Sequence, residues 1–368
     1  MIVGVAASIK IALSNVLLGI SGLLWLAVLV RGFARRPRAS ILVPLAGYAV
    51  VSVASALWSA DPRHSVTELA DLLTLALVPM IISMLDQRRW DRLLMLLAAV
   101  LAASATTGLM QYVLSGDPIH NRIRGFATHY MTFSGWTLVV TLVLLGRVFF
   151  DWNRRHLLWA LPAAALGVAT LLLGLTRGAW IGLATGLLLA VAAGRPRTLV
   201  MLPLVISLLV LLTPQPVLHR AATTLNPGDA ATRARLGMFR SGMGMVQDHP
   251  FLGLGPGLVQ PAFADYRRPN GPERIPHLHN NVIQIAAERG LAGLAAYLAV
   301  LIVFATHVVR AVRFGPTEAR PAVIGCAMAV AGVTAAGLFE YNWGDAEVWI
   351  VTLTSLSAPF ALAPRGSK

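Results

Sequence analysis

Long apolar runs recur along the whole chain, and they constrain its fold more than any other feature. Many are about 17–25 residues long, which is enough for a helix to cross the hydrocarbon core of a bilayer. They lack the strict alternation that a membrane β-barrel requires. Apolar residues make up 57% of the 368 residues and charged residues only 12%, with a mean hydropathy of +0.70. Soluble domains do not have this composition, so we predict an all-α polytopic membrane protein.

Arginine clusters between the apolar runs predict the topology. The formal net charge is +14, and Lys10 and Lys368 are the only lysines. Most arginines flank predicted spans, which indicates anchoring in the phospholipid bilayer and argues against a nucleic-acid partner. The first span continues well past Lys10, so we expect no cleavable signal peptide. Eleven spans are predicted, or twelve if residues 1–10 belong to a further helix: 11–30, 40–58, 67–85, 93–114, 128–150, two within 157–193, 198–213, 281–308, 321–338 and 346–363.

The chain divides at one long segment that is not apolar. We expect N-terminal transmembrane helices at 1–213, an outer loop at 214–280 and C-terminal transmembrane helices at 281–368, all in one integrated membrane domain. Within the loop a helix is predicted over 230–247, because four apolar residues recur there at three- and four-residue steps. We expect this stripe to pack on the membrane domain or to lie in the interface; it consists of Leu236, Phe239, Met243 and Val246.

Two histidines precede the helix that follows this loop. His277 and His279 stand between Pro276 and a pair of asparagines, of which Asn280 or Asn281 is suited to cap the helix. A neutral imidazole can accept a proton near pH 7, which makes this pair a candidate for general base catalysis. The alternative is that both are interfacial residues without chemistry. The single cysteine, Cys326, lies in an apolar run, so neither a disulfide framework nor a cysteine metal site is expected.

Arginines supply the candidate anion site. The outer loop holds more arginines than acids, and a guanidinium group suits bidentate phosphate binding. For most of these arginines we favour solvated charge or attraction to lipid headgroups. Arg177 differs, because it lies between two apolar runs, where an ionisable residue is a functional candidate; its alternative is snorkelling to headgroups. Arg122, Arg124 and His129 form a further outer cluster that we expect to be supporting rather than catalytic.

Three stretches together resemble the bacterial O-antigen ligase and O-antigen polymerase superfamily. Leu175-Thr-Arg-Gly-Ala-Trp-Ile-Gly-Leu is similar to the family's Ser-Arg-Gly segment at the outer end of a span. Arg235-Leu-Gly-Met-Phe-Arg with Asp248-His-Pro-Phe-Leu-Gly-Leu-Gly is similar to its Arg-x-x-x-Trp and His-Pro-x-x-Gly-x-Gly loop. The ligase pattern of His followed by Asn, Ser or Gln, then nine residues and Gly-x-x-Gly, is matched by His279-Asn280 and Gly290-Leu-Ala-Gly293. Thr176, Ile181 and Phe239 depart from the usual Ser, Leu and Trp.

The resemblance implies an O-antigen ligase, a glycosyltransferase of the bacterial inner membrane whose active site faces the periplasm. It would move a glycan from undecaprenyl diphosphate to a sugar hydroxyl of lipid A–core, without a cofactor and without a metal. By carry-over, His279 is the catalytic residue, while Arg177 and Arg235 bind the diphosphate. We expect inversion, because a double displacement needs a positioned carboxylate. Possible supporting residues are Arg233, Arg240, His277, Asn280 and Arg124.

Several alternatives stay open from the sequence. An O-antigen polymerase or a protein O-oligosaccharyltransferase of the same superfamily would share the loop and its arginines. A transporter or flippase would favour acids within the spans, and a purely structural scaffold would leave Arg177 unexplained. The acids Glu340, Asp345 and Glu347 fall at an outer turn rather than within a span, which disfavours transport.

Overall fold

A computed structural model describes residues 18–32, 36–115, 121–151, 153–194, 230–268 and 272–364, and every structural statement below concerns these residues. All their regular elements are helices. In chain order these are α2 (Leu42–Leu57), α3 (Pro62–Glu68), η1 (Leu69–Ala76), α4 (Leu77–Met84), α5 (Gln87–Ser115), α6 (Tyr130–Phe150), α7 (Arg154–Leu173), α8 (Arg177–Ala192), α11 (Ala230–Asp248), α12 (Val259–Tyr266), α13 (Asn281–Phe314), η2 (Thr317–Ala319), α14 (Arg320–Ala336), η3 (Asn342–Gly344) and α15 (Ala346–Leu362).

The prediction of an all-α polytopic membrane protein is confirmed. Six helical stretches are long and apolar enough to cross a membrane, and four shorter apolar helices accompany them, the first at Leu18–Val30. The predicted spans from 40–58 to 157–193 and from 281–308 to 346–363 coincide with these helices. The predicted span 198–213 and residues 1–10 lie outside the described residues, so the total of eleven or twelve stays a prediction.

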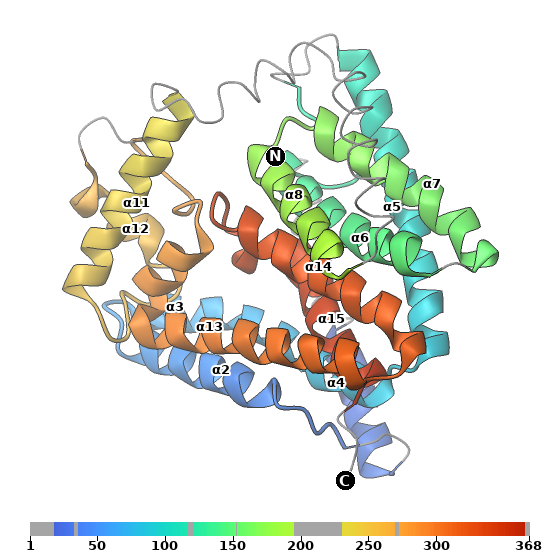
Figure 1. Ribbon diagram of the computed structural model, residues 1–368. Helices are drawn as coiled ribbons and strands as arrows, with labels where there is room; N and C mark the ends of the chain where they lie inside the picture. Colours follow the sequence, from blue (N-terminus) through green and yellow to red (C-terminus); the bar gives the residue numbers. More distant parts are fainter. Residues whose placement is uncertain are drawn as a thin grey trace.

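Helix α14 lies at the centre of the bundle and packs against α6, α8 and α15 (Figure 1). Small residues allow these helices to approach closely. A Cβ atom built on Gly146 of α6 would overlap the backbone of Gly325 in α14, and one on Gly182 of α8 would lie 2.6 Å from the carbonyl oxygen of Gly332. The helix that carries Arg177 is therefore held tightly against the centre of the protein.

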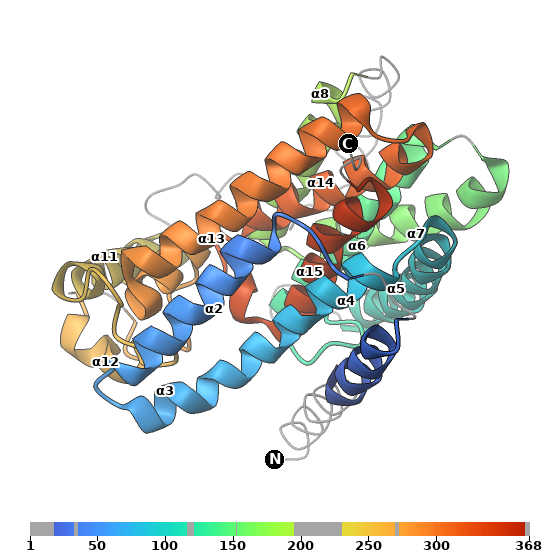
Figure 2. The ribbon, with the colours of Figure 1, turned by 90° about the horizontal axis from the view of Figure 1, so that it is seen from below.

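Helix α13 forms a second group with α2, and α11 and α12 pack against its N-terminal part (Figures 1 and 2). The helix bends at Gly290, whose φ of 66° is left-handed. The segment before α12 lies across this bend: Leu291 N donates to Pro250 O at 2.8 Å, and Leu254 N donates to Ala287 O at 2.8 Å. The glycine of the Gly-x-x-Gly motif is thus required where two backbones meet.

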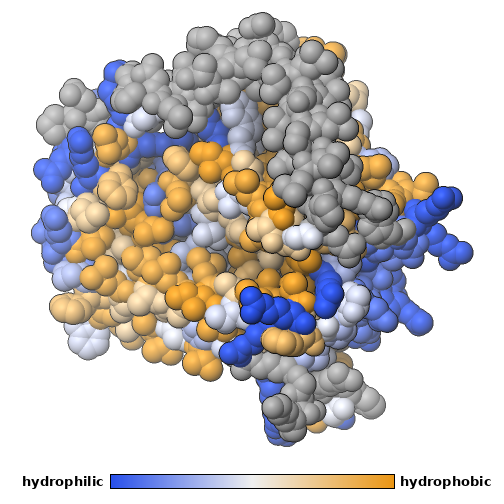
Figure 3. Space-filling model, viewed as in Figure 1, coloured by the Kyte–Doolittle hydropathy of each residue, from blue (hydrophilic) through white to orange (hydrophobic). Residues whose placement is uncertain are grey.

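Apolar side chains gather across the middle of the face in Figure 3, and hydrophilic side chains lie at its left and right margins. This is the pattern expected of a protein with a lipid-facing belt between two polar ends. We call the end that carries α11, α12 and residues 272–280 the loop end.

The predicted helix in the outer loop is confirmed as α11. Its apolar stripe is mostly not buried, and its place in the membrane interface stays a prediction. Leu236, Phe239 and Met243 are exposed, and only Val246 is buried. The buried face is rotated and consists of Met238, Ser241, Gly242, Met245 and Val246. Polar Ser241 and small Gly242 occur on this face because the packing is close: a Cβ atom on Gly242 would contact Ile283 and Leu278. The three- and four-residue spacing of apolar residues therefore did not identify the buried face of α11.

Candidate active site

The two histidines lie in a short turn that is tied to the start of α13. Asn280 is the N-cap: its side-chain oxygen accepts from Ile283 N at 3.1 Å, and its side-chain nitrogen donates to Leu338 O at 2.9 Å. His279 has a φ of 51°, a left-handed conformation that is uncommon for residues other than glycine. Such strain persists only where the surrounding contacts hold it. The turn therefore places His279 in one defined position.

A single carboxylate, Glu340, lies between the two imidazoles. His279 Nδ1 is 3.0 Å from Glu340 Oε2, and His277 Nε2 is 3.4 Å from Glu340 Oε1. His277 Nδ1 accepts from the backbone N–H of His279 at 3.3 Å, which assigns the proton of neutral His277 to Nε2. For neutral His279 the same reasoning puts the proton on Nδ1, next to the carboxylate. Its Nε2 then keeps the lone pair that a general base needs.

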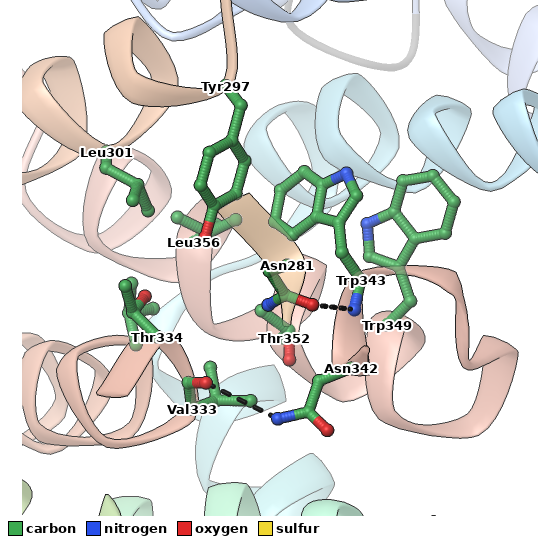
Figure 4. Close-up of a pocket in the computed structure, with 11 residues that line it drawn as sticks. Asn281, Tyr297, Leu301, Val333, Thr334, Asn342, Trp343, Trp349, Thr352 and Leu356 are labelled. Atoms are coloured by element: carbon green, nitrogen blue, oxygen red, sulfur yellow. Dashed lines mark hydrogen bonds between the residues drawn. The ribbon is translucent and has the colours of Figure 1, made fainter. Parts of the chain in front are cut away.

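Glu340 is held in place by the turn between α14 and α15. Asn281 N donates to Gly337 O at 2.6 Å, and the side-chain oxygen of Asn281 accepts from Trp343 N at 3.1 Å. Figure 4 shows this second bond beneath the rings of Tyr297 and Trp349, in a small pocket behind the turn. The histidine turn and the turn that carries Glu340 are thus joined through the first residue of α13.

Arg177, Arg235 and His279 line one cavity of about 250 Å³ at the loop end. Arg177 is the first residue of α8 and only 6% exposed. A helix N-terminus attracts anions through its N–H groups and its dipole. Arg177 and the N-terminus of α8 therefore both attract a negatively charged group. The remaining wall is mainly apolar and contains Ile181, Leu236, Phe239, Leu278, Leu338 and Phe339. The cavity therefore suits an anionic group that is attached to an apolar chain.

The charges in this region act on one another. Burial lowers the pKa of Arg235, Glu340 opposes this effect, and Arg177 and Arg122 add to it. Burial would raise the pKa of Glu340, but the hydrogen bond from His279 and the charges of both histidines hold it below its usual value. Burial also lowers the pKa of His277 to about 4. At neutral pH we therefore expect ionised Glu340 and neutral His277 beside two arginines.

A buried polar network supports the histidine turn from below. Leu278 N donates to the Gln284 side chain at 2.8 Å, and Gln284 donates to Glu288 at 2.8 Å. Glu288 also pairs with Arg289 at 2.5 Å and accepts from Gly257 N at 3.2 Å. Glu288 was not predicted from the sequence, and Glu340 was placed at an outer turn without a role in the site. Glu288 could have been suspected from the sequence, because it is a charged residue within the otherwise apolar start of the predicted span 281–308.

The two histidines and Glu340 also form the only group in the described residues whose ligand atoms could hold a metal ion, with these atoms within 4.8 Å of one another. Two imidazoles and a carboxylate are a known ligand set for zinc. The geometry is equally satisfied by the hydrogen bonds described above, in which His279 is oriented by the carboxylate. Metal independence stays a prediction.

The other predicted supporting residues do not all lie near His279. His277 and Asn280 lie beside His279, with Asn280 also in the cavity wall. Arg233 and Arg240 lie on the exposed face of α11 and are not among the described residues that line the cavity. Their supporting role stays a prediction. Arg124 lines a different cavity.

The pKa of His277 predicts how stability depends on pH. The unfolded chain takes up a proton at His277 below its usual pKa of 6.5, whereas the folded protein does so only near 4. Stability from neutral His277 is therefore complete above pH 6.5 and is lost as the pH falls toward 4. We expect the Tm of the wild type to fall more between pH 7 and pH 5 than that of His277→Gln. Identical slopes for the two proteins would contradict the prediction.

Comparison with protein families found a match. A family model described as O-antigen ligase matches residues 162–298. The matched region contains α8, α11, α12 and the first part of α13, so it includes Arg177, Arg235 and His279, whereas Glu340 lies beyond it. Comparison with curated proteins found no match.

Proposed function

This chain belongs to the O-antigen ligase superfamily, and from that premise we propose that it transfers a glycan from undecaprenyl diphosphate to a sugar hydroxyl of lipid A–core. Members of the family are glycosyltransferase-like ligases and polymerases that act on lipid-linked glycans in a membrane. The observation that carries the proposal is one cavity that is lined by Arg177, Arg235 and His279, with the Nδ1 of His279 bound to Glu340.

In the proposed reaction His279 is the general base. As the acceptor oxygen attacks the anomeric carbon, its proton moves to Nε2 of His279, and the charge of Glu340 stabilises the imidazolium that forms. The bond between the anomeric carbon and the diphosphate oxygen breaks, and the electron pair leaves with the lipid diphosphate. Arg177 and Arg235 stabilise that growing negative charge. Attack from the face opposite the leaving group gives inversion at the anomeric carbon.

The positions of the two loop carboxylates favour a direct displacement, because both lie outside the cavity lining. Asp248 and Asp265 are exposed, and neither lines the cavity, so neither is positioned as a nucleophile for a double displacement. The apolar wall of the cavity suits a polyprenyl chain. The arginine clusters at the opposite ends of the spans support an inner-membrane protein whose loop end faces the periplasm.

The related glycosyltransferases fit the site as well as a ligase does, whereas a transporter fits it less well. An O-antigen polymerase or protein O-oligosaccharyltransferase would use the same base and the same arginines, so the choice of ligase follows from the His279-Asn280 to Gly290 spacing. A transporter would need an acid in a span that can change its charge. Glu288 is buried in α13, but its carboxylate is bound by Arg289, Gln284 and Gly257, which is the arrangement of a structural residue.

Transfer by the purified full-length protein tests the function. The reaction contains undecaprenyl-diphosphate-linked glycan, rough lipopolysaccharide and a chelator, and the product is separated as a lipopolysaccharide ladder. We expect glycan on lipid A–core with chelator present. Longer lipid-linked glycan with bare lipid A–core would identify a polymerase instead, and transfer that requires an added divalent metal would contradict the metal-independent mechanism.

Glu340 is expected to position His279 and to stabilise its protonated form. For Glu340→Gln we expect kcat to fall on the order of 10²-fold or more, with the KM for the donor little changed. Glu340→Asp keeps the charge and should recover part of kcat. Equal losses in both variants, or a loss explained by a lower Tm, would reduce Glu340 to a structural residue of the turn.

A further inference from the structure

A second, larger cavity lies at the loop end between α5 and α6. Its volume is about 620 Å³, which is within the range of roughly 300–1,000 Å³ that is typical of ligand sites. The last turns of α5 supply Gln111 and Leu114, and the loop after α5 supplies Arg122, Arg124 and His129. The cavity therefore has a wall on a transmembrane helix and a basic wall on a connecting loop.

The basic loop is fixed to α5 before any ligand binds. Gln111 Oε1 accepts from the backbone N–H groups of Arg124 at 3.2 Å and Gly125 at 3.1 Å. Phe126 N donates to Ser104 Oγ at 3.0 Å, and the side chain of Ile123 is fully buried. A loop held by these contacts presents its side chains with little loss of conformational entropy on binding.

The described residues that line this cavity carry only positive charge. They include Arg122 and Arg124 and no acidic residue. The Arg122 guanidinium lies over the ring of Tyr130, 4.5 Å from its centroid, which restrains its plane. His129 Nδ1 accepts from Met131 N at 3.3 Å, so the neutral ring has its proton on Nε2 and can donate. Two guanidinium groups and an imidazole donor favour a phosphate group.

The opposite wall, on α5, is partly apolar. Met110 and Leu114 line the cavity and are largely exposed on α5, a helix long and apolar enough to span the membrane. A molecule in the cavity can therefore contact the basic loop with its polar part while its apolar part stays in the lipid. A soluble sugar phosphate would not use this apolar wall, whereas a glycolipid would.

This cavity adjoins the histidine site. Tyr130 lines it, and the next residue, Met131, lines a small neighbouring pocket together with Arg235 and Glu340. We propose that the cavity between α5 and α6 is the acceptor site, where Arg122 and Arg124 bind a phosphorylated sugar of an anionic glycolipid. The assignment as acceptor site rests on the proposed transfer reaction, since it places a second membrane-anchored substrate beside His279. The phosphate-binding role rests on the cavity alone.

Binding to the full-length His279→Ala protein in phosphatidylcholine nanodiscs tests the proposal. The probes are rough lipopolysaccharide with a phosphorylated core, the same molecule after removal of its core phosphates, and undecaprenyl-diphosphate-linked glycan. Substituting both arginines, Arg122→Ala with Arg124→Ala, should raise the Kd for the phosphorylated probe about tenfold for each arginine lost. The Kd for the donor should stay unchanged. Arg63→Ala, an exposed arginine at the same end that lines neither cavity, is the matched control and should bind like the parent.

The outcomes separate this inference from the proposed function. Unchanged binding of the phosphorylated probe in the double variant would overturn the inference, even with normal transfer by the wild type. Equal affinity for the dephosphorylated probe would overturn it as well. Displacement of the probe by phosphatidylglycerol at equal concentration would replace it with a lipid-headgroup site. Binding that depends on the arginines, in a protein whose wild type transfers nothing, would support the phosphate site while the proposed function fails.

Discussion

His279→Ala is expected to abolish glycan transfer, with kcat about 10³-fold lower, in a protein that still folds and binds both substrates. Among the described residues that line the cavity, His279 is the one suited to accept the hydroxyl proton, and its Nδ1 is bound to Glu340. The arginines remain in the variant, so the KM for the donor should change little. The measurement is initial-rate kinetics with each substrate varied in turn.

The left-handed backbone at His279 requires a second substitution. His279→Asn keeps a residue that tolerates a positive φ, so its turn should be less strained than that of His279→Ala. We expect the same loss of kcat in both variants and an unchanged Tm for His279→Asn. If His279→Asn transfers at the wild-type rate, His279 is a structural residue of the turn, and the search for the base moves to His277.

Much of the fold could be predicted from the sequence, because the signal is local. Runs of apolar residues determine where a chain can cross a bilayer, and the helix bounds follow these runs closely from α2 to α8 and from α13 to α15. The rotation of α11 could not be predicted in this way. Its buried face depends on where Leu278 and Ile283 lie, and that contact between distant segments is not encoded in the period of α11 itself.

The candidate site shows the same division. Motif spacing selected Arg177, Arg235 and His279, which the structure brings to one cavity. It did not find Glu340, which follows His279 by 61 residues and reaches it only because Asn281 joins the two turns. The sequence placed Glu340 at an outer turn but indicated no role for it. A residue that acts through a long-range contact has no local pattern to reveal it.

Arg177→Ala and Arg235→Ala should each lower kcat about 10²-fold, and the double variant should bind the donor weakly. Both guanidinium groups line the cavity; Arg177 is buried and Arg235 is half-buried, so water screens their charge less than at an exposed site. Arg177→Lys keeps the charge but loses the planar fork, so we expect it to recover only part of the rate. The loss should appear with short and long lipid chains alike, because the arginines act on the diphosphate.

Arg240→Ala provides a matched control for Arg235→Ala on the same helix. Arg240 is exposed and lies outside the cavity lining, so its removal changes the net charge equally without touching the diphosphate. Inorganic pyrophosphate should inhibit the wild type and the control but lose potency against Arg177→Ala and Arg235→Ala. If all three variants lose activity equally, a general effect of charge at the loop end replaces the diphosphate clamp. If Arg177→Ala and Arg235→Ala keep full activity, the cavity is not the donor site. A selective loss in the two cavity variants places the leaving group beside His279, where the transferred proton and the departing charge are handled by different residues.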